Sequence, residues 1–268
     1  MQRRILIIDD HDDLATALDD VFVRVGHEVR LVESYKEIAD VKDIDRYDLV
    51  ITDLNVDDPE SMSPNGSVCL PQISEDRRDA PQIKAFKLCA SNFRRDGFDE
   101  GELKNFVETV LNYKSQFVDK AEYVLGLHEN IEFEMPSSIS VMHSILDYLM
   151  KRVEKLGVIE AEKSNLFVAL DEAFVNAVKH GNKFDVEKLV RITAEVSKKE
   201  ARFTIEDEGE GFDVNSIPDP LDPANLFKTS GRGVLFIYNI MDEVKYNDRG
   251  NRLTMIKRSQ PKDAKTEG

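Results

Sequence analysis

The first ninety residues alternate short apolar runs with segments of helical spacing, and this alternation restricts the fold more than any other feature. The apolar runs that predict strands are residues 5–8, 28–32, 47–54 and 83–90. The segments that predict helices between them are residues 14–25, 34–41 and about 66–77. Strands that alternate with helices predict a parallel sheet with right-handed crossovers.

Length and charge limit the class of protein. A chain of 268 residues suggests two domains. With 36 basic and 52 acidic residues the net charge is -16, so DNA is not expected as a direct partner. No run of about 18 apolar residues predicts a membrane span, and the N-terminus does not have the pattern of a signal peptide. Cys69 and Cys89 predict neither a disulfide framework nor a metal cluster. We expect a soluble cytoplasmic protein.

An apolar stripe with nearly heptad spacing follows the alternating part. Its members are Leu103, Phe106, Val110, Tyr113, Phe117, Ala121 and Val124. The stripe predicts either one helix of about 25 residues or two helices with a break near residues 114–115. We expect it to pair with a second copy of the chain, as a homodimer, or to pack across the two domains.

The predicted domain boundaries follow from this reading. They are a first domain at 1–115, a connecting helix at 116–129, a second domain at 130–260 and a disordered tail at 261–268. The second domain is expected to be α+β. Its predicted strands are 131–135, 188–197, 200–207, 243–247 and 252–258, and its predicted helices are 138–156, 163–181 and 231–241.

Three carboxylates of the first domain are expected to meet at one edge of the sheet. Asp9 and Asp10 close the first strand, and Asp53 ends the third. The carboxyl ends of parallel strands form the usual ligand site of a doubly wound sheet. Carboxylates gathered there would repel one another without a cation, and Mg²⁺ prefers such oxygen ligands. The alternative is that each aspartate is a solvated loop residue.

The runs ILIIDD and ITDL, in this alternating pattern, resemble the receiver domain of response regulators over residues 3–113. The resemblance implies a flavodoxin-like fold in which Asp53 accepts a phosphoryl group, supplied by an upstream sensor histidine kinase. It also implies that the carboxylates of Asp9, Asp10 and Asp53 hold Mg²⁺ together with the carbonyl of Asn55.

The chain departs from the receiver pattern after its fourth strand. Ser91 is the best match to the Thr or Ser that receivers place there. Only nine residues separate Ser91 from the next helix, too few for the last helix and strand, which need about 20. The lysine of a fifth strand is therefore missing, and Lys87 and Lys104 are substitutes at positions that do not match. Productive phosphorylation of Asp53 and a degenerate receiver kept for docking both remain open.

The segment LFVALDEAFVNAVKHGNK at 166–183 has the first motif of the second domain. Glu172 and Asn176 are four residues apart, so they share one side of a helix. An amide oxygen of Asn176 suits Mg²⁺, and Glu172 suits a base that accepts a proton from an attacking hydroxyl. Lys179, His180 and Gly181 end this helix.

Two glycine-rich segments follow. In DEGEGFD, the carboxylate of Asp207 lies beside Gly209 and Gly211, an arrangement that suits the amino group of a purine. In SGRGVLF, Gly231 and Gly233 flank Arg232 and open a helix, whose free N–H groups suit phosphates.

In this order and spacing, DEAFVNAVKHGN, DEGEGFD and SGRGVLFIYNIMDEV resemble the GHKL ATPase fold, and within it the anti-sigma factor serine kinases, over about residues 131–258. The resemblance implies that ATP and Mg²⁺ are cofactors, that Glu172 is the catalytic base and that Asn176 is a Mg²⁺ ligand. The ATP-binding set that it implies is Asn176, Lys179, His180, Gly181, Asp207, Gly209, Gly211, Phe212, Gly231, Arg232, Gly233 and Thr254, with Thr254 at the adenine edge.

Kinases of this family phosphorylate a serine or threonine of an anti-anti-sigma partner of the STAS type, and they also sequester a sigma factor. The resemblance implies the same for this chain, under control of the receiver-like domain. One alternative is a partner-switch module that binds ATP without catalysis. Another is a histidine kinase remnant, although the surroundings of His143 lack the pattern of a phosphoacceptor histidine.

Overall fold

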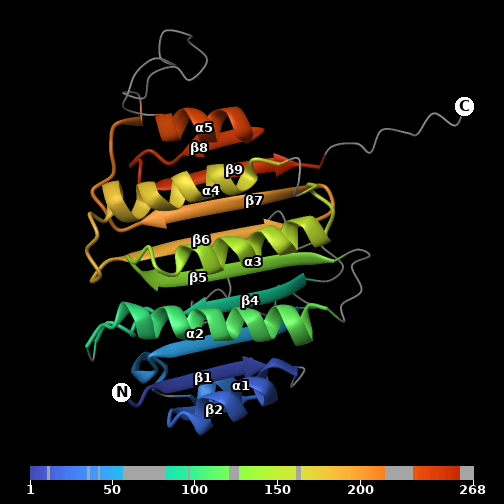
Figure 1. The fold of residues 1–268 in the computed structure, drawn as a ribbon, viewed down its shortest axis with the longest axis vertical. Coiled ribbons are helices and arrows are strands. Elements are labelled where there is room, and N and C mark those ends of the chain that lie inside the picture. The colour runs from blue at the N-terminus through green and yellow to red at the C-terminus, as the bar shows by residue number, and fades with distance from the viewer. Residues whose placement is uncertain are drawn as a thin grey trace, which may run out of the picture.

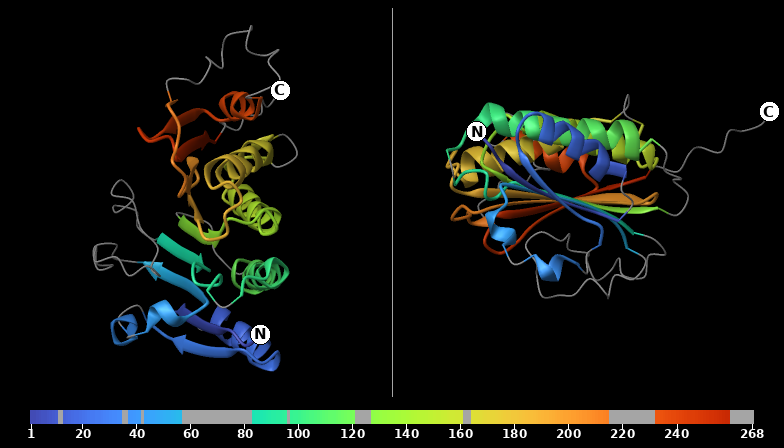
Figure 2. Two further views of the ribbon diagram at one scale, coloured as in Figure 1. Left: turned by 90° about the vertical axis from the view of Figure 1, so that its left-hand side faces the viewer. Right: turned by 90° about the horizontal axis from the view of Figure 1, so that it is seen from below.

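A single mixed sheet of nine strands forms the centre of the molecule (Figure 1). The computed structural model describes residues 1–10, 13–34, 37–41, 43–56, 83–95, 97–120, 127–160, 164–214 and 232–259. The strand order across the sheet is β2-β1-β3-β4-β5-β6-β7-β9-β8. Helices α1 to α5 all cover one face of the sheet, as Figure 2 shows from the side, and the main apolar core lies between them and the strands.

The N-terminal strands follow the predicted pattern at first. The elements are β1 (Arg4–Asp9), α1 (Asp13–Arg24), β2 (Glu28–Val32), two 3-10 helices (Glu37–Asp40 and Ile44–Arg46), β3 (Leu49–Val56) and β4 (Ile83–Cys89). β1 pairs in parallel with both β2 and β3. Of the helix predicted at 34–41, the described residues contain only the short 3-10 helix. A second apolar cluster covers the other face of these strands.

The direction of β4 corrects the all-parallel prediction. β4 runs antiparallel to β3, with Asp53 opposite Phe86. It then pairs in parallel with β5 (His128–Pro136). An apolar run buries its side chains equally well in either direction, so its periodicity does not reveal strand polarity. The helix predicted near 66–77 lies outside the described residues.

The apolar stripe begins as an α-helix that is shorter than the single helix of about 25 residues that we gave as one alternative. Helix α2 (Glu100–Tyr113) is capped by the side chain of Asp99, and a π-helical turn (Lys114–Val118) continues it. Residues 121–126 are not described, and His128 already begins β5. A connecting helix over all of 116–129 is therefore wrong, because its last two residues are in a strand. The change of helical type falls at the predicted break near 114–115.

The C-terminal half adds the remaining elements to the same sheet. They are α3 (Met142–Lys155), α4 (Leu166–Val175), a second π-helical turn (Asn176–Gly181), β6 (Leu189–Val196), β7 (Glu200–Asp207), α5 (Arg232–Ile240), β8 (Glu243–Tyr246) and β9 (Arg252–Arg258). The predicted tail at 261–268 lies outside the described residues. Among the helices described here, none is long and apolar enough to cross a membrane.

The sheet and its core continue across the boundary that we expected between two domains. The ring of Phe86 on β4 packs against Phe133 on β5 and Tyr148 on α3, with ring centroids 6.1 and 5.9 Å apart. These aromatic contacts bury apolar surface from both halves of the chain in one core. Changes in the first half therefore have a direct packing route to the helices of the second.

Candidate functional site

Glu172 and Asn176 lie together where two helices meet. Glu172 is on α4, and Asn176 is the first residue of the π-helical turn that extends it. Gly233, in the first turn of α5, lies against both. A Cβ there would overlap Oε2 of Glu172 and would lie 3.8 Å from Nδ2 of Asn176. The predicted base and the predicted Mg²⁺ ligand thus lie beside the predicted phosphate-binding glycine.

A second cluster forms around Asp207 at the end of β7. Gly181 is so close that a Cβ on it would overlap the Asp207 carboxylate, and a Cβ on Gly209 would overlap the carbonyl of Gly181. The backbone N–H of Gly209 donates to Oδ1 of Asp207 at 2.8 Å. Burial raises the pKa of Asp207, and this hydrogen bond opposes the rise. Glycines leave one edge of a carboxylate accessible to a flat ligand.

The turn between β8 and β9 holds the loop after Asp207 in place. Gly211 has a φ of 78°, and a Cβ on it would overlap the carbonyl of Arg249. The guanidinium of Arg249 donates to the carbonyl of Gly209 at 2.8 Å. The ring of Phe212 meets Tyr246 edge-on at 5.2 Å and is still 42% exposed. Gly211 and Phe212 therefore border the cluster around Asp207.

Two asparagines that we did not single out support this cluster. Asn182 is fully buried, and its amide donates to the hydroxyl of Ser137 and the carbonyl of Leu189 and accepts from the N–H of Glu208. Asn251 lies opposite Asp207 and donates to its backbone carbonyl at 2.7 Å. The only signal in the sequence was position, because Asn182 follows Gly181 directly.

Thr254 lies outside the cluster, and its prediction needs correction. It pairs with Thr204, and their hydroxyls are 3.3 Å apart. Side chains alternate along a strand, so Thr204 and Asp207 point to opposite faces of β7. Asp207 faces the helices, where Gly181 contacts it. Asn251 thus lies beside Asp207, whereas Thr254, which the resemblance placed at the adenine edge, is on the opposite face of the sheet.

The structure describes only some of the remaining residues that we predicted to bind the nucleotide. Lys179 and His180 are in the π-helical turn and are exposed. Arg232 begins α5, but its side chain is outside the described part, as is Gly231.

The three carboxylates of the first half come together at one edge of the sheet, since Asp9 lies level with Asp53 in the parallel pairing of β1 and β3 and the N–H of Asp10 donates to the carbonyl of Asp53 at 3.4 Å. Oδ2 of Asp9 accepts from the backbone N–H of Leu14 at 2.9 Å and of Ala15 at 2.8 Å, so it caps α1. Oδ2 of Asp10 accepts from the N–H of Asn55 at 3.0 Å. Within the residues that the structure describes, no three His, Cys, Asp or Glu side chains could hold a metal ion. Each of these carboxylates thus has a partner within the chain, and the shared Mg²⁺ site stays a prediction.

Lys114, which the sequence did not suggest, contacts Asp53 instead. Its ammonium lies 2.8 Å from Oδ2 of Asp53, and the exposed fractions of the two side chains are 2% and 4%. Burial raises the pKa of Asp53, while the charge of Lys114 lowers it. Lys114 is at the first position of a π-helical turn rather than at the end of a strand, where we looked for such a lysine.

The residues that we expected to replace the conserved lysine and hydroxyl of a receiver have other partners. Lys87 pairs with Glu132 at 3.1 Å, and the exposed Lys104 pairs with Glu108 at 3.8 Å. Ser91 lies 3.2 Å from the sulfur of Cys89. Because β4 is antiparallel to β3, its end is level with the beginning of β3 and far from Asp53. Ser91 therefore does not take the receiver position that we predicted for it.

The C-terminal half matches a known family of domains. Residues 135–257 match the family model described as the histidine kinase-like ATPase domain. This segment includes the clusters around Glu172 and Asp207.

Individual relatives agree with this class. The serine-protein kinase RsbW of Staphylococcus epidermidis is 27% identical over 146 residues, which are 52% of this chain and 92% of the relative. The serine-protein kinase RsbW of Staphylococcus aureus strain Newman is 25% identical over the same shares of the two chains. The chain is thus similar to serine-protein kinases over about half of its length.

Proposed function

We propose that this protein is an ATP-dependent protein serine/threonine kinase of the anti-sigma factor type. Its substrate is a serine or threonine of a STAS-type anti-anti-sigma protein, and it also sequesters a sigma factor in the cytoplasm. The contact that joins Glu172, Asn176 and Gly233 carries this proposal. That contact lies in the part of the chain that is similar to serine-protein kinases.

The residues around both clusters fit ATP. At Gly181, Gly209 and Gly233 only glycine lets the backbone come this close to the carboxylates and carbonyl beside it. Asp207 would accept a hydrogen bond from the adenine amino group, and the first turn of α5 would offer N–H groups to phosphates. Asn176 would hold Mg²⁺, which when bound neutralises phosphate charge. Glu172 would accept the proton of the substrate hydroxyl.

The N-terminal half is proposed to control the kinase through Asp53. In this proposal an upstream sensor histidine kinase supplies the phosphoryl group that Asp53 accepts. Oδ1 of Asp53 has no hydrogen-bond partner among the described residues, whereas Oδ2 faces Lys114. Mass spectrometry after treatment with acetyl phosphate tests this step, with Asp53→Ala as the control. An adduct that is absent, or that persists in Asp53→Ala, would leave the N-terminal half a docking unit.

A homodimer through the exposed end of the apolar stripe, at Phe117, belongs to the same proposal, because Leu103, Phe106 and Val110 of α2 pack in the core of their own chain. The ring of Phe117 is 60% exposed, and its centroid lies 5.4 Å from that of Tyr113. The exposed ring of Phe117, which lies beside the half-buried Tyr113, supports pairing with a second copy, and analytical ultracentrifugation of Phe117→Ser tests it. A monomer in both proteins would exclude the homodimer.

Transfer of label from γ-labelled ATP tests the kinase proposal. Purified protein is incubated with a STAS-type anti-anti-sigma protein of the same organism, and acid-stable label on that partner supports the proposal. Glu172→Gln should abolish transfer and keep ATP binding, whereas its neighbour Asp171→Asn should keep both. ATP binding without transfer would favour the non-catalytic module. Acid-labile label on this chain itself would favour the histidine kinase remnant.

A further inference from the structure

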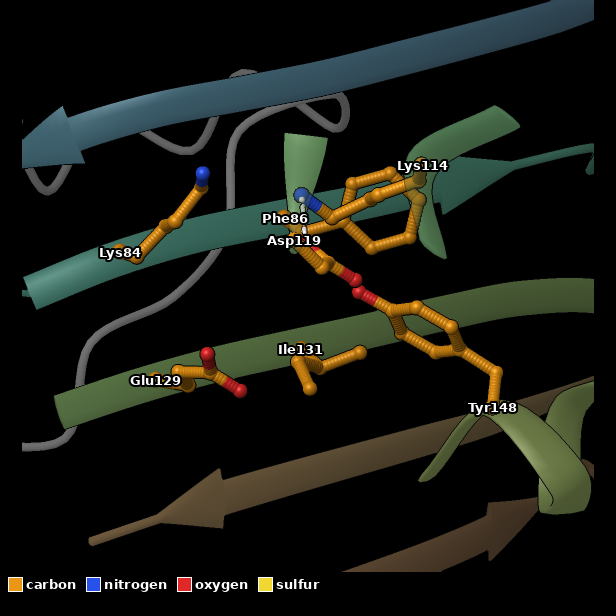
Figure 3. Close-up of a pocket in the computed structure, with 7 residues that line it drawn as sticks. All are labelled: Lys84, Phe86, Lys114, Asp119, Glu129, Ile131 and Tyr148. Carbon is orange, nitrogen blue, oxygen red and sulfur yellow. Dashed lines mark ion pairs between the residues drawn. The ribbon is translucent and has the colours of Figure 1, made fainter. Parts of the chain in front are cut away.

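Lys114 bridges two carboxylates where α2 ends. It lies 2.8 Å from Oδ2 of Asp53 on β3 and 3.3 Å from Oδ1 of Asp119, which follows the π-helical turn. Figure 3 shows Lys114 and Asp119 facing each other above β4 and β5. All three side chains are less than 10% exposed. Charges this deeply buried are held by specific partners rather than by water.

Helix α3 holds the other side of Asp119. Nη1 of Arg152 lies 3.3 Å from Oδ2 of Asp119, and Nζ of Lys155 donates to its carbonyl. Arg152 also contacts Glu129 on β5 through Nε at 2.9 Å and through Nη2. Asp119 is thus shared between Lys114, which faces Asp53, and the last turns of α3.

A small pocket lies beside the series of ion pairs that Asp53, Lys114, Asp119 and Arg152 form. It is lined by Lys84, Phe86, Lys114, Asp119, Glu129, Ile131 and Tyr148, which come from β4, β5, α3 and the end of α2 (Figure 3). The ammonium of Lys114 lies 4.9 Å from the centroid of the Phe86 ring. The pocket thus lies directly beside the ammonium that is shared between the two carboxylates.

Helix α3 connects this series of ion pairs to the nucleotide site. It packs beside α4, which has Glu172, in the same apolar core (Figure 1). His143, in the first turn of α3, packs against Phe167 of α4 in a tilted arrangement with ring centroids 6.3 Å apart. The charged contacts are at the C-terminal end of α3 and the contact with Phe167 is at its N-terminal end, so a shift that moves the whole helix would reach α4.

We propose that Lys114, Asp119 and Arg152 are positioning residues that couple the charge on Asp53 to α3, and through α3 to Glu172 and Asn176. When Asp53 is charged, Lys114 is shared between two carboxylates. When Asp53 is neutral, Lys114 turns wholly to Asp119 and holds α3 more firmly. The link to nucleotide binding rests on the proposed function, whereas the link to α3 stands without it.

Hydrogen exchange of the full-length protein tests the first link. Asp53→Asn removes the charge with almost no change of shape, and Asp48→Asn is a matched control. Asp48 is likewise buried and paired, with Arg3 at 3.4 Å, but it does not contact α3. We expect α3 amides to exchange at least about threefold more slowly in Asp53→Asn than in Asp48→Asn. A smaller difference, or faster exchange, overturns the proposal.

A double-variant cycle with a fluorescent ATP analogue tests the second link. Asp53 pairs with Lys114 and Arg152 pairs with Asp119, so substitutions that act independently should change the analogue Kd by the product of the single effects. We expect Asp53→Asn combined with Arg152→Lys to depart from that product by at least about threefold. A double variant whose analogue Kd equals the product of the single effects would overturn the proposed coupling of Asp53 to nucleotide binding. Absence of analogue binding in the unsubstituted protein counts against the proposed function alone, since exchange of α3 still decides the first link.

A third variant covers the case in which Asp53→Asn does not fold. Lys114→Gln removes the ammonium that joins Asp53 to Asp119. Lys104→Gln is its control, because it changes an exposed lysine of the preceding helix α2. We expect α3 to exchange at least about threefold faster in Lys114→Gln than in Lys104→Gln. Equal exchange in the two variants overturns the proposal.

Discussion

The ammonium of Lys114 lies 2.8 Å from a carboxylate oxygen of Asp53, although 61 residues separate the two in sequence. Both side chains are almost fully buried, so each depends on the other for its charge. Lys114 also contacts Asp119. This one ammonium therefore joins β3 to the segment that leads into β5.

Lys114→Met should lower the free energy of unfolding by about 3–5 kcal/mol, because it leaves the buried carboxylate of Asp53 without the cation that contacts it. Lys104→Met is the control, since its exposed pair with Glu108 should contribute less than about 1 kcal/mol. Urea unfolding followed by circular dichroism measures both. Equal effects of the two substitutions would show that the Lys114 pair does not stabilise the fold.

Gly233→Ala should reduce phosphoryl transfer by roughly a hundredfold, because the new methyl group would displace the Glu172 carboxylate. Gly101→Ala is the control, since a Cβ there meets only Oδ1 of Asp99, at 3.3 Å. The labelled-ATP assay measures both variants. Unchanged transfer in Gly233→Ala would mean that Glu172 is not the base.

Nucleotide binding should weaken in acid because of Asp207. The ionised carboxylate accepts the adenine amino group, and protonation removes that acceptor. Since burial raises the pKa of Asp207, the loss should begin at a higher pH than for an exposed aspartate. Titration of ATP binding against pH checks this, and Asp207→Asn should bind weakly with little pH dependence. A steep dependence retained in Asp207→Asn would assign it to another group.

Asn182→Ala should destabilise the protein by roughly 2–3 kcal/mol, because it leaves buried donors and acceptors unpaired around Glu208 and Leu189. ATP affinity should fall with it, since Gly181 and Asp207 lose their support. Asn239→Ala is the control, because the side chain of Asn239 is exposed and bonds only to its own helix. Unfolding and ATP titrations measure both. Equal stability of the two variants would contradict the role given to Asn182.

Much of the local structure was predictable from the sequence. The strands at 28–32, 200–207 and 252–258 coincide with the observed ones, because side-chain periodicity directly reflects which face is buried. The helical spacing of Glu172 and Asn176 likewise placed both on one side. Such features depend on neighbours within a few residues.

The long-range arrangement could be decided only by the tertiary structure. The antiparallel direction of β4 depends on how a long connection returns, which periodicity does not contain. Lys114 meets Asp53, and Asn251 rather than Thr254 meets Asp207, because strand pairing and helix packing bring distant residues together. The sequence by itself determined many of the helices and strands and the motifs that they hold, although not the helices expected at 34–41 and 116–129. Only the packing of one continuous sheet decided which of those residues touch, because contacts between distant segments depend on burial and charge pairing in the whole fold.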